Sequence, residues 1–133
     1  MKTAAQAGTE STGNGARTLF APPMPKPTNP MVLPGRESLA EMLASIDSGL
    51  WVEDALGLGQ GNVISGAFSN SFSLAYRIEN GEIVGRVKDV SIAGNVYDLL
   101  SRVEAVSRET EWVYDSFSLP HLLISDMNVV SRE

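Results

Sequence analysis

Residues 71–87, SFSLAYRIENGEIVGRV, carry the strongest structural signal in the chain. Large apolar side chains alternate with small or polar ones over the first half of this stretch, which is the period of a strand with one buried face. The apolar positions are Phe72, Leu74, Tyr76 and Ile78. The alternation therefore predicts a half-buried strand.

Asn80-Gly81 follows this strand and predicts a two-residue type I′ turn, because both turn positions need a positive φ that asparagine and glycine tolerate. Such a turn also fixes the register of the returning strand. Glu79 should face Glu82, Ile78 should face Ile83, Tyr76 should face Gly85, and Leu74 should face Val87. The apolar pairs then share one face, so the turn and the alternation predict the same β-hairpin.

A helix is predicted upstream, at Ser38-Leu39-Ala40-Glu41, which has the form of a capping box. Its apolar stripe follows the helical spacing i, i+3, i+4 and i+7. The stripe consists of Leu39, Met42, Leu43 and Ile46. Gly49 is the residue that we expect to close this helix in the left-handed conformation.

Shorter apolar runs predict further strands at residues 50–54, 63–68, 90–93, 103–106 and 121–130. A second short helix should begin after Asn95 as its N-cap. Its apolar side would consist of Val96, Leu99, Leu100 and Val103. Two short helices against six or seven strands predict an α+β fold that is β-rich, with a mainly antiparallel sheet or a barrel-like arrangement.

The first 35 residues differ in composition from the rest of the chain. Residues 1–17 are small and polar, and residues 18–35 hold six of the seven prolines, which favours an extended backbone. We therefore divide the chain into an extended arm, 1–35, and a β-rich domain, 36–133. The arm is either a flexible tail or a segment laid across a partner, and its apolar side chains favour the second. These are Leu19, Phe20, Met24, Met31, Val32 and Leu33.

The composition excludes several classes of protein. The chain has no cysteine, so it has neither a disulfide framework nor a thiolate zinc site. A net charge of −6 and isolated basic residues argue against binding to nucleic acid. No apolar stretch has the length of a membrane span or the form of a signal peptide, so we expect no membrane partner and a cytoplasmic location.

No catalytic arrangement is evident in the sequence. His121 is the only histidine, whereas zinc sites and nucleophilic serines need further partners. Glu53 and Asp54 are adjacent in a predicted strand, so they should point to opposite faces and not act as a pair. The glycine-rich stretch at residues 55–62 lacks the residues that follow a phosphate-binding loop and is interpreted as a connection.

Six segments, in order, resemble the C-terminal third of the TldD/PmbA family, long labelled "modulator of DNA gyrase". They are STGNGAR at 11–17, PKPTNPMVLPG at 25–35, SLAEMLASIDSGLWV at 38–52, YRIENGEI at 76–83, IAGNVYDL at 92–99 and LPHLLISDM at 119–127. Their order and spacing make the resemblance specific. Two positions depart from the family pattern: Asp126 stands where the family carries glycine, and residues 106–109, VSRE, replace a glycine-containing turn.

The resemblance implies a two-subunit peptidase with one catalytic and one non-catalytic subunit. In the catalytic subunit, zinc is held by two histidines of an HExxxH helix and by a cysteine in an insertion before the closing strand. Here only residues 116–119 separate Asp115 from Pro120, which resembles the non-catalytic, PmbA/TldE-like member. Zinc is then expected only in a catalytic partner. The implied partners are a TldD-like subunit or a second copy of this chain, with a peptide as substrate.

We accordingly expect no catalytic, cofactor-binding or metal-binding residue in this chain, whose role would be subunit pairing and a share of the peptide groove. The candidate interface or groove residues are Arg17, Phe20, Thr28, Asn29, Trp51, Gly94 and Asn95. Two alternatives remain open: a stand-alone interaction or dimerisation module, and a regulator of DNA gyrase.

Overall fold

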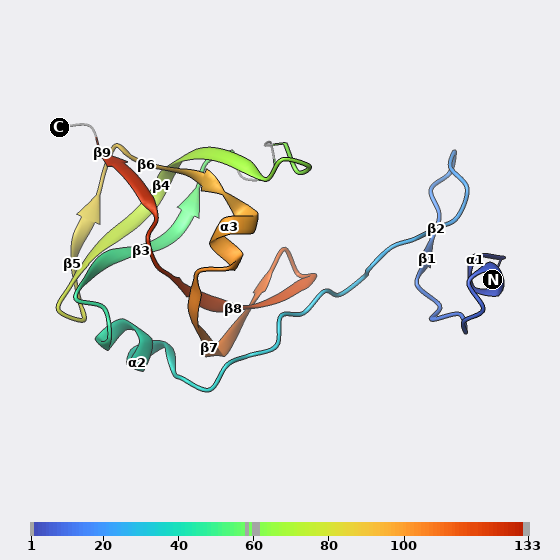
Figure 1. Ribbon diagram of the computed structural model, residues 1–133, viewed down its shortest axis with the longest axis horizontal. Coiled ribbons are helices and arrows are strands. Elements are labelled where there is room, and N and C mark those ends of the chain that lie inside the picture. The colour runs from blue at the N-terminus through green and yellow to red at the C-terminus, as the bar shows by residue number, and fades with distance from the viewer. Residues whose placement is uncertain (1, 58, 60–61, 132–133) are drawn as a thin grey trace. The chain divides into compact units, whose positions relative to one another are not determined.

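The computed structural model describes residues 2–57, 59 and 62–131 (Figure 1). The helices are α1 (Lys2–Gln6), α2 (Leu39–Ala44) and α3 (Val96–Leu100). The strands are β1 (Gly15–Ala16), β2 (Met24–Pro25), β3 (Ser48–Ala55), β4 (Ala67–Glu79), β5 (Glu82–Val87), β6 (Val90–Asn95), β7 (Val103–Val113), β8 (Phe117–Ile124) and β9 (Asn128–Ser131). The predicted α+β, mainly antiparallel fold is confirmed, with one helix more than expected in the described part of the chain.

The chain forms two compact units, and the division falls within the β7–β8 hairpin. Unit 1 comprises Met1–Val32 and Glu111–Leu119, and unit 2 comprises Leu33–Thr110 and Pro120–Glu133. The sequence-based division after residue 35 stays a prediction. None of the described helices is long and apolar enough to cross a bilayer.

Unit 1 contains the additional helix, α1, whose alanines are strong helix formers. It is followed by a small antiparallel pair, in which Gly15 faces Pro25 and Ala16 faces Met24. In the same unit, the backbone of Ser118 donates to Pro30 O at 3.2 Å and accepts from Val32 N at 3.1 Å.

Unit 2 is built on β4, which is 13 residues long and has strands along both edges. β3 pairs with one edge, while β5 and β6 pair with successive parts of the other edge, and β9 extends the sheet beside β6. Figure 1 shows these strands curving together, with α3 at one end of β6 and α2 near the β4–β5 turn.

The hairpin prediction is confirmed at its turn and only in part along its strands. Asn80 and Gly81 have φ of 50° and 81°, and Glu79 and Ile78 face Glu82 and Ile83 as expected. A β-bulge then inserts Val84, so Gly85 faces Arg77 instead of Tyr76. The same shift places Val87 opposite Ala75 instead of Leu74. Ala75, predicted on the polar face, is fully buried.

Two other boundaries were predicted wrongly, each because of a local turn. Residues 63–66 do not begin a strand, since Asn62 Oδ1 accepts from Ile64 N and Ser65 N and closes a turn. The expected strand at 121–130 is divided at Asp126, which has a φ of 54°. Residues 106–109, which depart from the family pattern, lie within β7, so this strand extends beyond the predicted end at residue 106. Leu58, Gln60 and Gly61 of the predicted glycine-rich connection lie outside the described residues.

Helix α2 begins as the sequence predicts. Ser38 N donates to Glu41 Oε2 at 2.7 Å, and Glu41 N donates to Ser38 Oγ at 3.2 Å, which completes the capping box. The helix ends differently from the prediction: Ser45 is the C-cap, and Gly49 lies in β3 without a positive φ. The second cap is also confirmed, because Asn95 Oδ1 accepts from Tyr97 N at 2.9 Å at the start of α3.

The segment before α2 is fixed along β7 by backbone contacts. Gly35 N donates to Ser107 O at 2.9 Å, and Arg108 N donates to Glu37 O at 2.7 Å. A Cβ on Gly35 would lie 1.9 Å from Val106 O, so only glycine allows this approach. Ser107 is completely buried there, and its hydroxyl accepts from His121 N and donates to Glu109 O.

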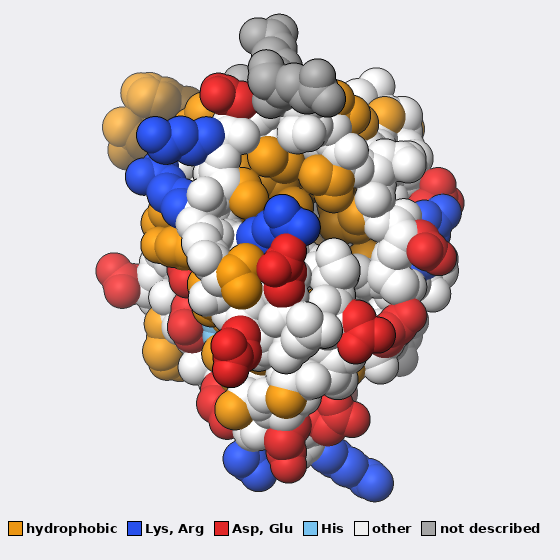
Figure 2. Space-filling model, turned by 90° about the vertical axis from the view of Figure 1, so that its left-hand side faces the viewer, with side chains coloured by type: hydrophobic (Ala, Val, Ile, Leu, Met, Phe, Trp, Pro, Cys, Tyr) orange, Lys and Arg blue, Asp and Glu red, His pale blue; other side chains and the backbone are white. Residues whose placement is uncertain are grey.

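Few apolar side chains are buried in the described part of the chain: Met42, Ala75, Ile78, Val90 and Pro120. Figure 2 shows hydrophobic side chains reaching the surface within a hollow on the face that lies at the left of Figure 1. The strands on that side, β5 and β9, expose Ile83, Val84, Val129 and Val130. Unit 2 is therefore a shell of strands around an interior that its own side chains fill only in part.

Gly35→Ala should lower the free energy of unfolding by about 1–3 kcal/mol, because the added methyl group meets backbone atoms that cannot move aside. Chemical denaturation measures this change. Gly85→Ala is the matched control, since nothing lies within 4 Å of its Cβ position, and it should change stability by about 0.5 kcal/mol or less. Equal effects of the two substitutions would contradict the close approach to β7.

The N-terminus of α2 should make stability dependent on pH. The pKa of Glu41 is lowered chiefly by the hydrogen bond from Ser38 N, and the pKa of Glu109 is lowered chiefly by that from Leu39 N. These bonds are absent in the unfolded chain, so their stabilisation is present above the ordinary carboxyl pKa of 4.5 and is lost as pH falls through the lowered folded values. Urea denaturation at a series of pH values should show a shallower acid decline for Glu41→Gln and Glu109→Gln. Glu82→Gln, on β5, should leave that decline unchanged.

Candidate ligand cavity

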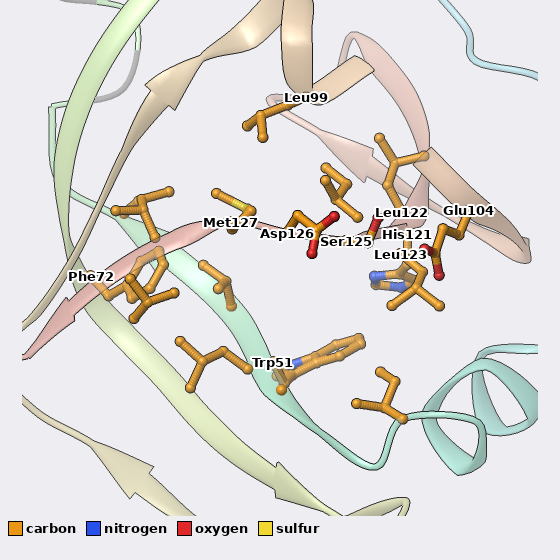
Figure 3. Close-up of a pocket in the computed structure, with 18 of the residues that line it drawn as sticks. Trp51, Phe72, Leu99, Glu104, His121, Leu122, Leu123, Ser125, Asp126 and Met127 are labelled. Carbon is orange, nitrogen blue, oxygen red and sulfur yellow. The ribbon is translucent and has the colours of Figure 1, made fainter. Parts of the chain in front are cut away.

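Unit 2 encloses an open cavity of about 1000 Å³. Figure 3 shows that side chains from several elements point into it, with Phe72 of β4, Trp51 of β3 and Leu99 of α3 on different sides. The described residues of the α2–β3 connection and of the β8–β9 segment also line the cavity. The lining is mainly apolar, as it is in most small-molecule and peptide-binding pockets.

Two strand edges also contribute to the cavity. Consecutive residues line it along 45–52 and along 121–127, although neighbouring side chains of a strand point to opposite faces. This pattern arises where a cavity passes along the edge of a strand as well as its face. Among the described strands, β3 pairs with β4 and β8 pairs with β7, while Ser118 of β8 also bridges to Met31. Residues 48–52 of β3 and 121–124 of β8 therefore border the cavity.

An aromatic pair lies across the cavity between these two strands. The ring centroids of Trp51 and His121 are 5.0 Å apart, and the rings are tilted by 39° (Figure 3). The indole N–H of Trp51 donates to Glu53 Oε1 on the same strand. The pair gives the cavity an aromatic, partly polar wall whose tryptophan ring is held by this hydrogen bond.

The ionisable side chains that line the cavity are His121 and three carboxylates, Asp47, Glu104 and Asp126. No lysine or arginine is among the lining residues that the structure describes. Glu104 and Asp126 are both exposed to solvent, and Figure 3 shows them on the side of the cavity where His121 and Ser125 lie. The apolar interior is therefore bordered by negative charge.

The turn at residues 62–66 covers another side of the cavity and is attached to α3. Tyr97 Oη donates to Val63 O at 2.6 Å, and Asn95 Nδ2 donates to Ser65 O at 2.7 Å. Gly66 has a φ of 71°, and a Cβ there would lie 2.5 Å from the Tyr97 ring. These contacts fix the turn against the start of α3.

The structure separates the predicted interface or groove residues into two groups. Trp51 lines the cavity, whereas Asn95 caps α3 and Gly94 lies against the Phe68 ring, so both have structural roles in unit 2. Arg17, Phe20, Thr28 and Asn29 are exposed residues of unit 1, and Phe20 is 95% exposed. Contact of any of these residues with a partner or a peptide stays a prediction.

Sequence reasoning missed the part of the lining that comes from residues 122–127. These residues were predicted as the interior of one continuous strand. The departure of Asp126 from the family glycine was the signal that could have located the break, since glycine at such a position indicates a positive φ.

No group of three or more potential metal ligands occurs among the residues that the structure describes. His121 packs its ring against Trp51, and Asp54 accepts a hydrogen bond from the Ser73 hydroxyl while Glu53 accepts one from Trp51. The residues that the structure describes therefore do not form the zinc site that the family resemblance assigns to a catalytic subunit.

A model of the PmbA/TldA metallopeptidase C-terminal domain matches residues 1–131. The chain belongs to the PmbA/TldD family. It is similar to a Buchnera aphidicola metalloprotease TldD homologue, with 36% identity over 74% of this chain and 20% of the relative. It is also similar to a Haemophilus influenzae metalloprotease PmbA homologue, with 36% identity over 55% of this chain and 16% of the relative.

Solved structures of the PmbA/TldD family share the fold. A Thermotoga maritima protein, named for a proposed role as a modulator of a DNA gyrase, matches with a TM-score of 0.80 and 34% identity over 98% of this chain and 29% of that chain. TldE from Thermococcus kodakarensis matches with a TM-score of 0.79 and 30% identity over 96% of this chain and 29% of that chain. The sequence thus spans less than a third of each relative.

The backbone at Asp126 should tolerate only some substitutions. Asp126→Gly and Asp126→Asn should each change the free energy of unfolding by about 0.5 kcal/mol or less, because both residues accept a positive φ. Asp126→Val should lower it by about 1–2 kcal/mol, since a β-branched side chain disfavours that conformation. Thermal denaturation followed by circular dichroism measures all three, and a harmless valine would argue against the left-handed turn between β8 and β9.

Proposed function

We propose that this chain is the C-terminal domain of a non-catalytic, PmbA/TldE-like subunit of a two-subunit zinc metallopeptidase. The observation that carries the proposal is a match to the family over residues 1–131 in a sequence with no cysteine and one histidine. The β7–β8 turn supports it, because β7 ends at Val113 and β8 begins at Phe117, which leaves three residues where the catalytic subunit carries its cysteine-containing insertion.

In this proposal the cavity of unit 2 forms part of the peptide groove. Its apolar lining would receive side chains of the peptide, and the outer edges of β3 and β8 would offer backbone groups to an extended chain. Trp51 and His121 would form the wall between the two edges.

Subunit pairing is assigned to unit 1, whose large apolar side chains are exposed. Phe20, Trp112 and Tyr114 are 95%, 63% and 88% exposed, and aromatic residues are enriched where proteins bind one another. Arg17, Thr28 and Asn29 lie in the same unit and would form the polar surroundings of these anchors. The proposed partner is a TldD-like catalytic subunit in the cytoplasm.

Metal analysis and a peptidase assay test the non-catalytic assignment. The purified chain should contain no stoichiometric zinc and should not cleave peptides alone, whereas a complex with a TldD-like subunit should cleave them. Zinc bound at one ion per chain together with cleavage by this chain alone would refute the proposal.

The pairing surface is tested by Phe20→Asp, which places a charge on an exposed aromatic anchor. We expect the affinity for a TldD-like subunit, or for a second copy, to fall by about tenfold or more. Ile64→Asp in unit 2 is the matched control, since Ile64 is similarly exposed and should not affect pairing. Equal losses in the two variants, measured by sedimentation or calorimetry, would exclude unit 1 as the pairing surface.

The alternative of a stand-alone dimerisation module is supported by the same exposed side chains. It predicts that the chain self-associates without a TldD-like subunit and has no effect on peptide cleavage when that subunit is added.

A further inference from the structure

We propose that the cavity of unit 2 selects peptides in which a short apolar segment adjoins a lysine or arginine. This inference rests on the proposed function, because it names the kind of peptide that the groove takes. It depends on two independent features of the cavity, its apolar volume and the sign of the charges around it.

The apolar lining of the cavity is the reason to expect an apolar segment in the ligand. The cavity of about 1000 Å³ is at the upper end of the range of pockets that hold drug-sized ligands, so several apolar side chains fit together. Phe72, Leu99, Leu123 and Met127 line it from four different elements or connections. A ligand that buries only polar groups would leave these side chains in contact with water.

The charges at the border of the cavity are the reason to expect a basic residue in the ligand. Glu104, Asp126 and Asp47 are exposed, so their carboxylates remain hydrated without a ligand. Arg102 is the basic residue in contact with this border, and its guanidinium donates to the backbone oxygen of Asp126 at 2.8 Å and not to a lining carboxylate. Three carboxylates and no lysine or arginine among the described lining residues leave a negative border, which attracts a basic side chain and repels an acidic one.

The border and the apolar interior are close enough to act on one peptide. Figure 3 shows Glu104 and Asp126 beside His121, Leu122 and Ser125, the same part of the wall that continues to Leu123 and Met127. An extended residue advances the chain by about 3.3 Å, so neighbouring residues of one peptide reach both regions. The cavity should therefore recognise an apolar segment of the peptide together with a neighbouring basic residue, and not a single side chain.

Fluorescence anisotropy with three labelled peptides tests the inference on the full chain. Each peptide carries the same apolar segment, leucine-valine-leucine-leucine, next to two lysines, two serines or two glutamates. The lysine peptide should bind about tenfold more tightly than the glutamate peptide at low salt, and the difference should shrink at high salt.

The double variant Glu104→Gln/Asp126→Asn identifies the source of this preference. It should reduce the difference between the lysine and glutamate peptides to about twofold or less, while the serine peptide keeps its affinity. Glu82→Gln/Asp98→Asn is the matched control, because it removes two exposed carboxylates that do not line the cavity and should preserve the preference.

The possible outcomes separate this inference from the proposed function. Equal binding of the lysine and glutamate peptides would overturn the charge selectivity and leave the peptidase assignment standing. Persistence of the preference in the double variant would also overturn it, since the charge would then lie elsewhere. Failure of all three peptides to bind to folded protein would exclude the cavity as a peptide site, while zinc analysis and the reconstituted peptidase assay still decide the family role.

Discussion

Strand β4 hydrogen-bonds along both of its edges, and the arrangement of unit 2 depends on this pairing. One edge holds β3, and the other holds β5 and β6 one after the other, so a single 13-residue strand sets the position of three neighbours. Its end is fixed to the α2–β3 connection, because Gly81 N donates to Ile46 O and Asn80 N donates to Asp47 O, both at 2.8 Å. The turn thereby positions the helix and β3 as well as β5.

The cavity lies where this arrangement leaves strand edges without a partner strand. β4 pairs with one edge of β3, and among the described strands the other edge of β3 and the outer edge of β8 beyond the bridge at Ser118 have no further strand beside them. Side chains from both strands point into the space between, and the rings of Trp51 and His121 meet there. An apolar interior bordered by open strand edges is suited to an extended chain, which is why the peptide groove is assigned to this part of the domain.

Local signals predicted local structure well. The Asn80-Gly81 turn, the Ser38–Glu41 capping box and the Asn95 cap all appear as expected, because each depends on a few neighbouring atoms. The failures have a different origin. The bulge at Val84 is a feature of the pairing between β5 and β4, and the turn that Asn62 closes is held in place by hydrogen bonds from Tyr97 and Asn95, which lie in another part of the chain. Asp126 adopts a positive φ, which aspartate tolerates but does not by itself predict.

The sequence by itself determined the fold class, the family and the absence of a thiolate ligand, since composition, hydrophobic period and ordered motifs are properties of the chain alone. Tertiary structure decided where the cavity lies and which residues border it. Glu104, His121 and Asp126 come from separate stretches, and they share one wall only because β7, β8 and the turn before β9 fold against β3 and α3. Such a grouping arises from contacts between distant residues, and no local pattern encodes it.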